Sequence, residues 1–230
     1  MLKERLKSIL RGSGSPGKTE PPRARPPARP PLKSGQKETC RTRPSRGLEQ
    51  FFGYFRDQSG LSVLDLGGVF QENINFITSL GHKFYSEDFL RIFEETFGAE
   101  PGDQSNPSRI EYFLRQSLNY PDDHFDGVLA WDVMEYLAPP LLSATVDRLE
   151  RVLKPNGYLL AFFNSAEQAE PSPYYSFRIQ DCANLQVTEY GQRDRAQLFN
   201  NRKLEKLFQK FGGLKFFLTR EHLREVIVRK

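Results

Sequence analysis

The chain has 230 residues, with 33 Lys and Arg against 29 Asp and Glu and a hydrophobic fraction of 38%. This length allows one domain of medium size plus a tail, and the apolar fraction excludes a chain that is disordered throughout. No segment approaches the roughly 18 consecutive apolar residues of a membrane-spanning helix, so an integral membrane protein of that kind is not expected.

The first 47 residues differ sharply in composition from the remainder. They hold 13 Lys and Arg, 3 Asp and Glu and 8 of the 16 prolines, which leaves the tail at net +10 and the rest of the chain at net −6. Because residues 12–47 offer little apolar surface to offset the entropy of ordering, we predict a disordered tail over 1–47 and a structured domain over 48–230. The tail's basic charge leaves contact with nucleic acid or with an anionic membrane open, although no aromatic residue interleaves the arginines of 12–47 as a stacking platform.

The two cysteines and three histidines are scattered along the chain. Cys40 and Cys182 make no metal-ligand spacing with each other or with a histidine, so no metal site is expected. Such sparse cysteine usage suits a reducing compartment, and we expect the protein to be cytoplasmic.

The first structured elements surround a pair of glycines. We expect a helix over 48–55, a strand over 63–66, a helix over 71–80 and a strand over 82–85. Gly67 and Gly68 end the first strand in a turn that larger side chains would block. Glu87 follows Asp65 by 22 positions, where a βαβ unit presents a carboxylate to a ribose. This stretch therefore predicts a nucleotide-type site.

The remaining elements continue the alternation of strands and amphipathic helices. We expect helices over 89–97, 141–153 and 195–211, and strands over 109–114, 125–131, 158–163, 214–219 and 224–229. The alternation predicts an α/β fold with a doubly wound parallel sheet, which binds its ligands at the carboxyl ends of the strands.

Four segments carry a family resemblance. They are VLDLGG at 63–68, SED at 86–88, YPDDHFDGVLAWDVMEYL at 120–137 and DRLERVLKPNGYLLAFF at 147–163. In these segments the chain resembles the class I S-adenosylmethionine-dependent methyltransferases over about residues 48–230. The resemblance implies a Rossmann-like sheet of seven mostly parallel strands, with helices on both faces and an antiparallel last strand.

The resemblance also implies the residues of the cofactor site. Backbone and carboxylate groups of the first motif hold the methionine part of the cofactor, and an acid after the second strand binds the ribose hydroxyls. The segment after the fourth strand lines the methyl-donor pocket. In this order the matching positions are Asp65, Gly67 and Gly68; Glu87, with Asp88 as the rival; and Trp131 and Asp132.

The acceptor side is expected after the fourth and fifth strands, since such loops carry specificity. The candidates there are Glu135, Tyr174, Tyr175 and Arg178. Methyl transfer from a sulfonium asks only for alignment, desolvation and sometimes a general base. No metal is needed, and the base stays unidentified, with His124 as one candidate.

The predicted function is S-adenosylmethionine-dependent methyl transfer to an unidentified, small-molecule acceptor. The chain lacks the N/D-P-P-Y/F/W run typical of enzymes that methylate amino groups of DNA. An alternative from another class is a non-catalytic methyltransferase-fold protein that binds or scaffolds partners. Val69 and Leu114 favour this alternative, because they stand where the family places a glycine and an acid that reads the adenine.

Overall fold

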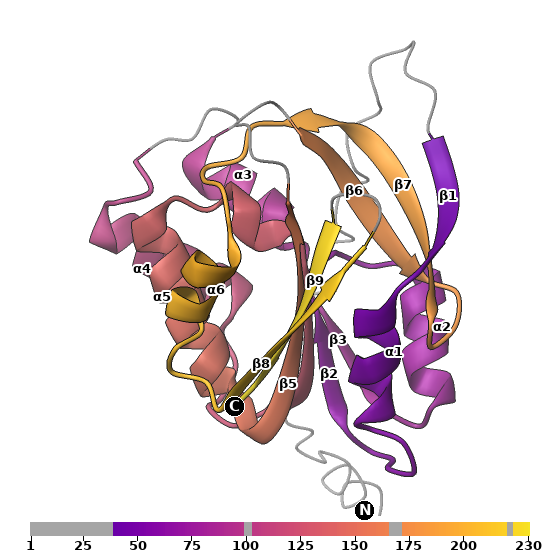
Figure 1. Ribbon diagram of the computed structural model, residues 1–230. Coiled ribbons are helices and arrows are strands. Elements are labelled where there is room, and N and C mark those ends of the chain that lie inside the picture. Colours follow the sequence, from indigo (N-terminus) through magenta and orange to yellow (C-terminus); the bar gives the residue numbers. More distant parts are fainter. Residues whose placement is uncertain (1–38, 99–102, 166–171, 220–222) are drawn as a thin grey trace, which may run out of the picture. The chain divides into compact units, whose positions relative to one another are not determined.

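The computed structural model of the protein describes residues 39–98, 103–165, 172–219 and 223–230 (Figure 1). The predicted tail over 1–47 lies outside these residues up to position 38. Residues 39–44 of it form a strand and residue 46 begins a helix, so the structured part starts earlier than predicted. The contact with nucleic acid or an anionic membrane that the basic charge of the tail leaves open is not tested by the described residues.

The main sheet has six strands in the order β3-β2-β4-β5-β9-β8. They are β2 (Ser62–Asp65), β3 (Lys83–Ser86), β4 (Phe125–Trp131), β5 (Leu153–Asn164), β8 (Gly213–Leu218) and β9 (Leu223–Arg229). β2 to β5 pair in parallel, and β9 runs antiparallel between β5 and β8. The expected doubly wound fold with an antiparallel final strand is confirmed, with six strands among the described residues in place of seven.

The seventh strand was predicted over 109–114, and this prediction is wrong. This stretch lies inside helix α4 (Pro107–Ser117), whose first turn is capped by Asn106, with Pro107 in the favoured position just inside the helix. The Asn106 side chain accepts hydrogen bonds from the backbone N–H groups of Ser108 and Arg109. Ile110, Phe113 and Leu114, whose pattern suggested a strand, instead pack at helical spacing against the core.

A second sheet was not predicted. It joins β1 (Thr39–Pro44), β7 (Asn184–Arg193) and β6 (Ser172–Ile179), all antiparallel, in the order β1-β7-β6. β6 occupies part of the segment expected as an acceptor loop after the fifth strand. Phe177, Ile179, Leu185 and Val187 of this sheet are buried against the main sheet. The small sheet therefore covers part of one face of the main sheet.

The helices divide between the two faces of the main sheet (Figure 1). α1 (Arg46–Gly53) and α2 (Gln71–Ser79) share one face with the small sheet, and α3 (Phe89–Phe97), α4, α5 (Pro139–Val152) and α6 (Asn201–Leu207) cover the other. Gly127 of β4 lets α1 lie close, since an added Cβ would stand 2.7 Å from the Phe51 ring. The predicted helix over 195–211 is shorter than expected, because Ala196 and Gln197 bond to the segment after β4 instead.

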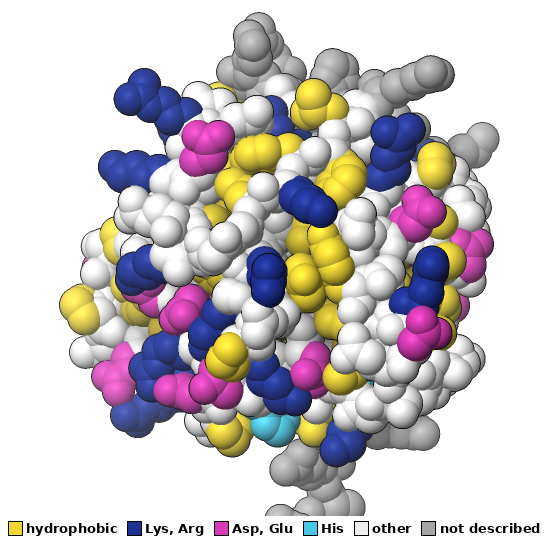
Figure 2. All heavy atoms as spheres, turned by 60° about the horizontal axis from the view of Figure 1, so that its bottom comes forward, with side chains coloured by type: hydrophobic (Ala, Val, Ile, Leu, Met, Phe, Trp, Pro, Cys, Tyr) yellow, Lys and Arg dark blue, Asp and Glu magenta, His cyan; other side chains and the backbone are white. Residues whose placement is uncertain are grey.

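Ion pairs between Asp and Arg or Lys side chains lie at the amino ends of the parallel strands β4 and β5. Asp122 pairs with Arg148 and Arg151, and Asp126 pairs with Lys154. Figure 2 brings the lower end of Figure 1 forward and shows Lys and Arg side chains interspersed with Asp and Glu there. Both side chains are exposed in the Asp122–Arg151 pair, and such a pair contributes little stability.

Candidate cofactor and acceptor site

The carboxyl ends of β2 and β4 border the point where the strand order reverses. From β2 the chain proceeds to β3 on one side and later to β4 on the other, and such switch points are where open α/β sheets bind ligands. Asp65 ends β2, Glu87 follows β3, and Trp131 ends β4. The structure thus brings the three predicted strand-end positions to one place.

Asp65 is completely buried, and both of its carboxylate oxygens accept hydrogen bonds. Oδ1 accepts from the backbone N–H of Gly67 at 2.8 Å and from the indole N–H of Trp131 at 2.6 Å, while Oδ2 accepts from the Asn73 amide at 2.7 Å. Burial raises the pKa of Asp65 to about 6, although these hydrogen bonds act in the opposite direction. The side chain is therefore held in place entirely by the protein.

Asn73 links this carboxylate to the small sheet. Its amide donates to the Phe177 carbonyl at 3.2 Å as well as to Asp65, and its oxygen accepts from the Ile179 N–H at 2.7 Å. This buried residue of α2 was not among the predicted site residues. Its role depends on β6 lying over α2, which no local sequence pattern indicated.

Trp131 has an unusual backbone and a crowded side chain. Its φ of 50° lies in the left-handed region, which a bulky residue rarely adopts. The indole is 1% exposed and stacks on Phe177 with ring centroids 5.1 Å apart. A Cβ added at Gly67 would meet the indole Cδ1 at 2.8 Å. The ring therefore lies directly against the glycine turn.

Gly68, Glu87 and Asp88 form the other side of the turn. Gly68 has φ 93°, which favours glycine, and its N–H donates to the backbone carbonyl of Glu87 at 3.1 Å. The Glu87 carboxylate is half-buried, and the Tyr120 hydroxyl donates to one of its oxygens; burial raises its pKa. Asp88 instead caps α3 by accepting from the Arg91 N–H. Glu87, rather than Asp88, is thus the carboxylate placed for a ligand.

Two acidic side chains, Asp132 and Glu135, lie directly after β4, and we call them the acidic group. Asp132 precedes the short helix η1 (Val133–Tyr136), and Glu135 lies within it. Asp132 and Glu135 are 4% and 3% exposed. Burial raises the pKa of Asp132 to about 6 and that of Glu135 to about 8, and the Asp132 charge contributes to the Glu135 shift. Tyr136 donates to Asp132 at 3.1 Å, and Glu135 accepts from the Asn164 N–H at 2.6 Å.

The predicted acceptor residues of β6 separate into different surroundings. Tyr174 contacts Arg193, whose guanidinium lies 5.3 Å from its ring centre and 5.2 Å from that of Tyr136. Tyr175 packs toward the buried Phe177 ring. Arg178 lies over the Phe70 ring at 4.9 Å. Two predicted β6 residues therefore reach the acidic group: Tyr175 does so directly, through a hydrogen bond from its backbone to the Asp132 carboxylate, and Tyr174 does so through Arg193, which sequence reasoning missed.

His124, the candidate base, lies at the amino end of β4, against the rings of Tyr120 and Phe125. A strand of seven residues, roughly 20 Å, separates it from Asp132 at the other end. The structure thus does not bring His124 to the acidic group. Over the described residues, no three His, Cys, Asp or Glu side chains form a group able to hold a metal ion, and no helix is long and apolar enough to cross a membrane.

A family model described as "Methyltransferase domain" matches residues 37–213, more than half of the chain. The chain belongs to this methyltransferase family. The match extends across β1 to α6 and so includes the glycine turn, the acidic group and the small sheet.

Solved structures with a similar fold include methyltransferases. A 1,6-didemethyltoxoflavin-N1-methyltransferase from Burkholderia thailandensis has 12% identity and a TM-score of 0.45 over 80% of this chain and 76% of its own. A SAM-dependent methyltransferase from Archaeoglobus fulgidus has 17% identity and a TM-score of 0.46 over 80% and 91%. Among the curated proteins compared by sequence, none matches the chain.

Membership of the methyltransferase family makes S-adenosylmethionine the cofactor that the site has to fit. Its nucleoside half fits the residues beside β3. The half-buried Glu87 carboxylate has one oxygen bonded to Tyr120, and the neighbouring Ser86 hydroxyl is buried with no hydrogen-bond partner in the described part of the chain. Both groups suit ribose hydroxyls, which donate and accept.

The methionine half coincides with the Trp131 side chain. The resemblance assigns Asp65 and Gly67 to this part of the cofactor, yet the indole donates to Asp65 and lies against Gly67. In this structure Trp131 therefore fills space that was predicted to be an open methyl-donor pocket. The methionine part would need this side chain to turn away from Gly67 and Asp65.

Proposed function

We propose that the protein transfers a methyl group from S-adenosylmethionine to a small acceptor at the carboxyl ends of β2, β3 and β4. The observation that carries this proposal is the glycine turn. In a chain of the methyltransferase family, Gly68 bonds to the backbone of Glu87, and the half-buried Glu87 carboxylate stands beside it at the switch point of the sheet.

On the donor side, the chain contributes binding and orientation. Glu87 accepts hydrogen bonds from the ribose hydroxyls, and Tyr120 fixes the orientation of its carboxylate. When bound, the cofactor supplies a methyl group already activated on a positively charged sulfur. Trp131 moves away from Gly67 and thereby frees the Asp65 carboxylate to accept one hydrogen bond from the cofactor.

On the acceptor side, Asp132 and Glu135 supply the proton acceptor. Burial makes both carboxylates stronger bases than ordinary ones, and Asp132, with a pKa of about 6, is the member of the pair that is mostly ionised near neutral pH, while Glu135, with a pKa of about 8, is mostly protonated. The bond from the acceptor's heteroatom to the methyl carbon forms as the carbon–sulfur bond breaks, and the acceptor's proton passes to this pair. Burial under β6 leaves little room around Asp132, which supports a small acceptor.

The test is a titration of the full chain with S-adenosylmethionine and S-adenosylhomocysteine, followed by calorimetry and by tryptophan emission. Trp131 is the only tryptophan in the sequence, so its emission reports directly on this site. We expect saturable binding near −8 kcal/mol, a dissociation constant of about 1 μM, with a change in emission at the same midpoint.

The controls are two glutamate substitutions. Glu87→Ala should weaken binding about tenfold or more, because a ribose hydroxyl loses its charged partner. Glu111→Ala, at an exposed position of α4, should leave binding unchanged. A folded sample that shows no heat with either ligand would overturn the proposal and favour a non-catalytic protein.

A further inference from the structure

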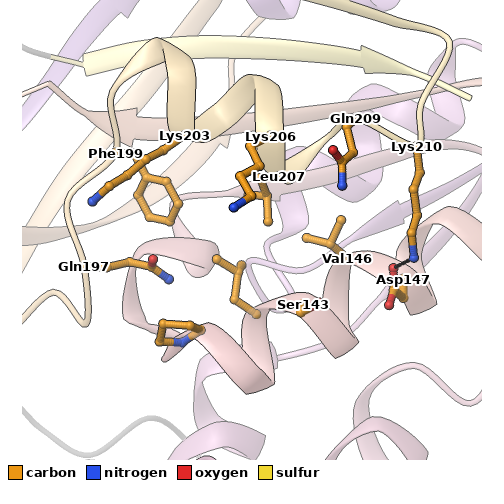
Figure 3. Close-up of a pocket in the computed structure, with 12 residues that line it drawn as sticks. Ser143, Val146, Asp147, Gln197, Phe199, Lys203, Lys206, Leu207, Gln209 and Lys210 are labelled. Carbon is orange, nitrogen blue, oxygen red and sulfur yellow. Dashed lines mark hydrogen bonds and ion pairs between the residues drawn. The ribbon is translucent and has the colours of Figure 1, made fainter.

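A groove of about 400 Å³ lies between α5 and the segment that carries α6, on the face opposite to the small sheet (Figure 3). Its lining residues are Pro139, Leu142, Ser143, Val146, Asp147, Gln197, Phe199, Lys203, Lys206, Leu207, Gln209 and Lys210. None of them belongs to the cofactor and acceptor site described above. The groove is therefore a separate candidate for binding.

The floor of the groove is apolar and comes from both sides. Leu142 and Val146 of α5 are 3% and 4% exposed, and Phe199 opposite them is 7% exposed. Leu207 of α6 is partly buried beside them. Figure 3 shows the Phe199 ring and the Leu207 and Val146 side chains directed into the space between the two segments. Such a floor offers an apolar ligand surface that is already fixed by the core.

The rim of the groove is basic. Lys203, Lys206 and Lys210 recur at helical spacing along α6 and the turn after it, and all three are exposed. Lys210 pairs with Asp147 at 2.6 Å, and the Lys203 ammonium donates to the Leu198 carbonyl at 2.8 Å. For Lys206, no hydrogen bond or ion pair is found with any residue that the structure describes. The lining residues include three cations and one carboxylate, and Glu150 adds a second negative charge near Lys210, so the rim stays net positive on a domain whose sequence over 48–230 is net −6.

We propose that this groove binds a single-chain anionic amphiphile, an aliphatic carboxylate whose chain lies on the apolar floor and whose head group meets Lys206. The two parts of such a ligand match the two parts of the groove, and the volume is within the range of small-molecule sites. The ligand is the monomer in solution, because the floor lies below the lysines and takes up one chain. The inference is independent of the proposed methyl transfer.

The test is calorimetric titration of the full chain with hexanoate, octanoate and decanoate, each below its micelle concentration. Affinity should rise about fourfold for each added methylene, the value expected for burial of a CH₂ group. Octan-1-ol, which has the same chain without the charge, should bind more weakly than octanoate. Saturating S-adenosylhomocysteine should leave the affinity for octanoate unchanged.

Three variants at exposed positions locate the binding. Lys206→Glu should weaken octanoate binding about fivefold by reversing one rim charge. Ser143→Trp should abolish binding by covering the floor. Lys83→Glu, at an exposed position of β3, makes the same change in net charge and should have no effect.

Two results would overturn the inference. One is affinity that does not depend on chain length or that falls equally in Lys206→Glu and Lys83→Glu, since this would show non-specific attraction of anions. The other is binding to anionic phospholipid vesicles without binding of the monomeric carboxylates, which would identify a membrane surface as the partner.

Discussion

At the scale of single residues, Trp131 determines how much of the donor site is open. It combines a left-handed backbone, a hydrogen bond to the buried Asp65 and a stack on Phe177. Strained backbone conformations of this kind cost of order 1–3 kcal/mol and persist where neighbouring contacts hold them. Under the proposed function, the same indole that completes the free protein's core competes with the methionine part of the cofactor.

Replacing Trp131 by Ala should strengthen the binding of S-adenosylhomocysteine, because the competing side chain is gone. The same change should lower the free energy of unfolding by about 3–5 kcal/mol, since a large buried ring is lost. Calorimetric titration and urea denaturation of wild type and variant measure the two effects. Weaker binding by a variant that is folded would mean that the indole contacts the cofactor rather than excludes it.

The strand-end residues of the site were predictable because their positions follow from local pattern. Asp65 and Glu87 lie where strands end in a βαβ unit, and parallel strands bring such ends together. Asn73, Tyr120 and Arg193 were not predictable as partners. Each reaches the site through a contact between elements far apart in sequence, and its own neighbours in the chain give no sign of that contact.

At the scale of elements, the start of the domain is fixed by one carboxylate of β9. Glu225 is fully buried and accepts from the Arg43 guanidinium at 2.9 Å, the Ser45 hydroxyl at 3.0 Å and the Gly47 N–H at 2.6 Å. Ser45 also caps α1. One side chain thus joins the end of β1 and the start of α1 to the main sheet.

Replacing Arg43 by Met should destabilise the protein by about 3–5 kcal/mol, because it leaves Glu225 as a buried charge without its ion-pair partner. Urea denaturation measures the loss. Adding Glu225→Gln to this variant should recover part of the stability, since the amide keeps an acceptor without a charge. A loss below about 0.5 kcal/mol in Arg43→Met would show that Ser45 and Gly47 suffice to hold the carboxylate.

The alternation of elements made the main sheet predictable, whereas two departures required tertiary information. The apolar residues of 109–114 fit a strand or a helix, and the Asn106–Pro107 start decides for the helix. The small sheet depends on β1 pairing with β7, from Thr39 opposite Glu189 to Pro44 opposite Asn184. Composition placed these first residues in the tail, because a short basic strand resembles a linker until its partner is known.

At the scale of the whole molecule, buried carboxyl groups give the stability a defined pH dependence. Burial raises the pKa of Asp65 and Asp132 from 3.8 to about 6 and that of Glu135 from 4.5 to about 8. The folded protein therefore holds these protons to higher pH than the unfolded chain does. Their stabilising contribution is fully present below the unfolded pKa values and is lost as the pH rises through the folded values.

Glu135→Gln should remove the largest part of this loss. The glutamine is isosteric with the protonated acid and can still accept from the Asn164 N–H, so the two proteins should have similar unfolding free energies near pH 4. As the pH rises to about 8, wild type should lose on the order of 4 kcal/mol relative to the variant, because ionising Glu135 in the core costs free energy that ionising it in the unfolded chain does not. Urea denaturation at intervals between pH 4 and pH 8 measures the difference. Parallel curves for the two proteins would show that Glu135 ionises in the folded protein as easily as in water. That result would also remove Glu135 from the proposed proton-accepting pair. If Glu135 does have that role, Glu135→Gln should lose methyl transfer while it gains stability at pH 8.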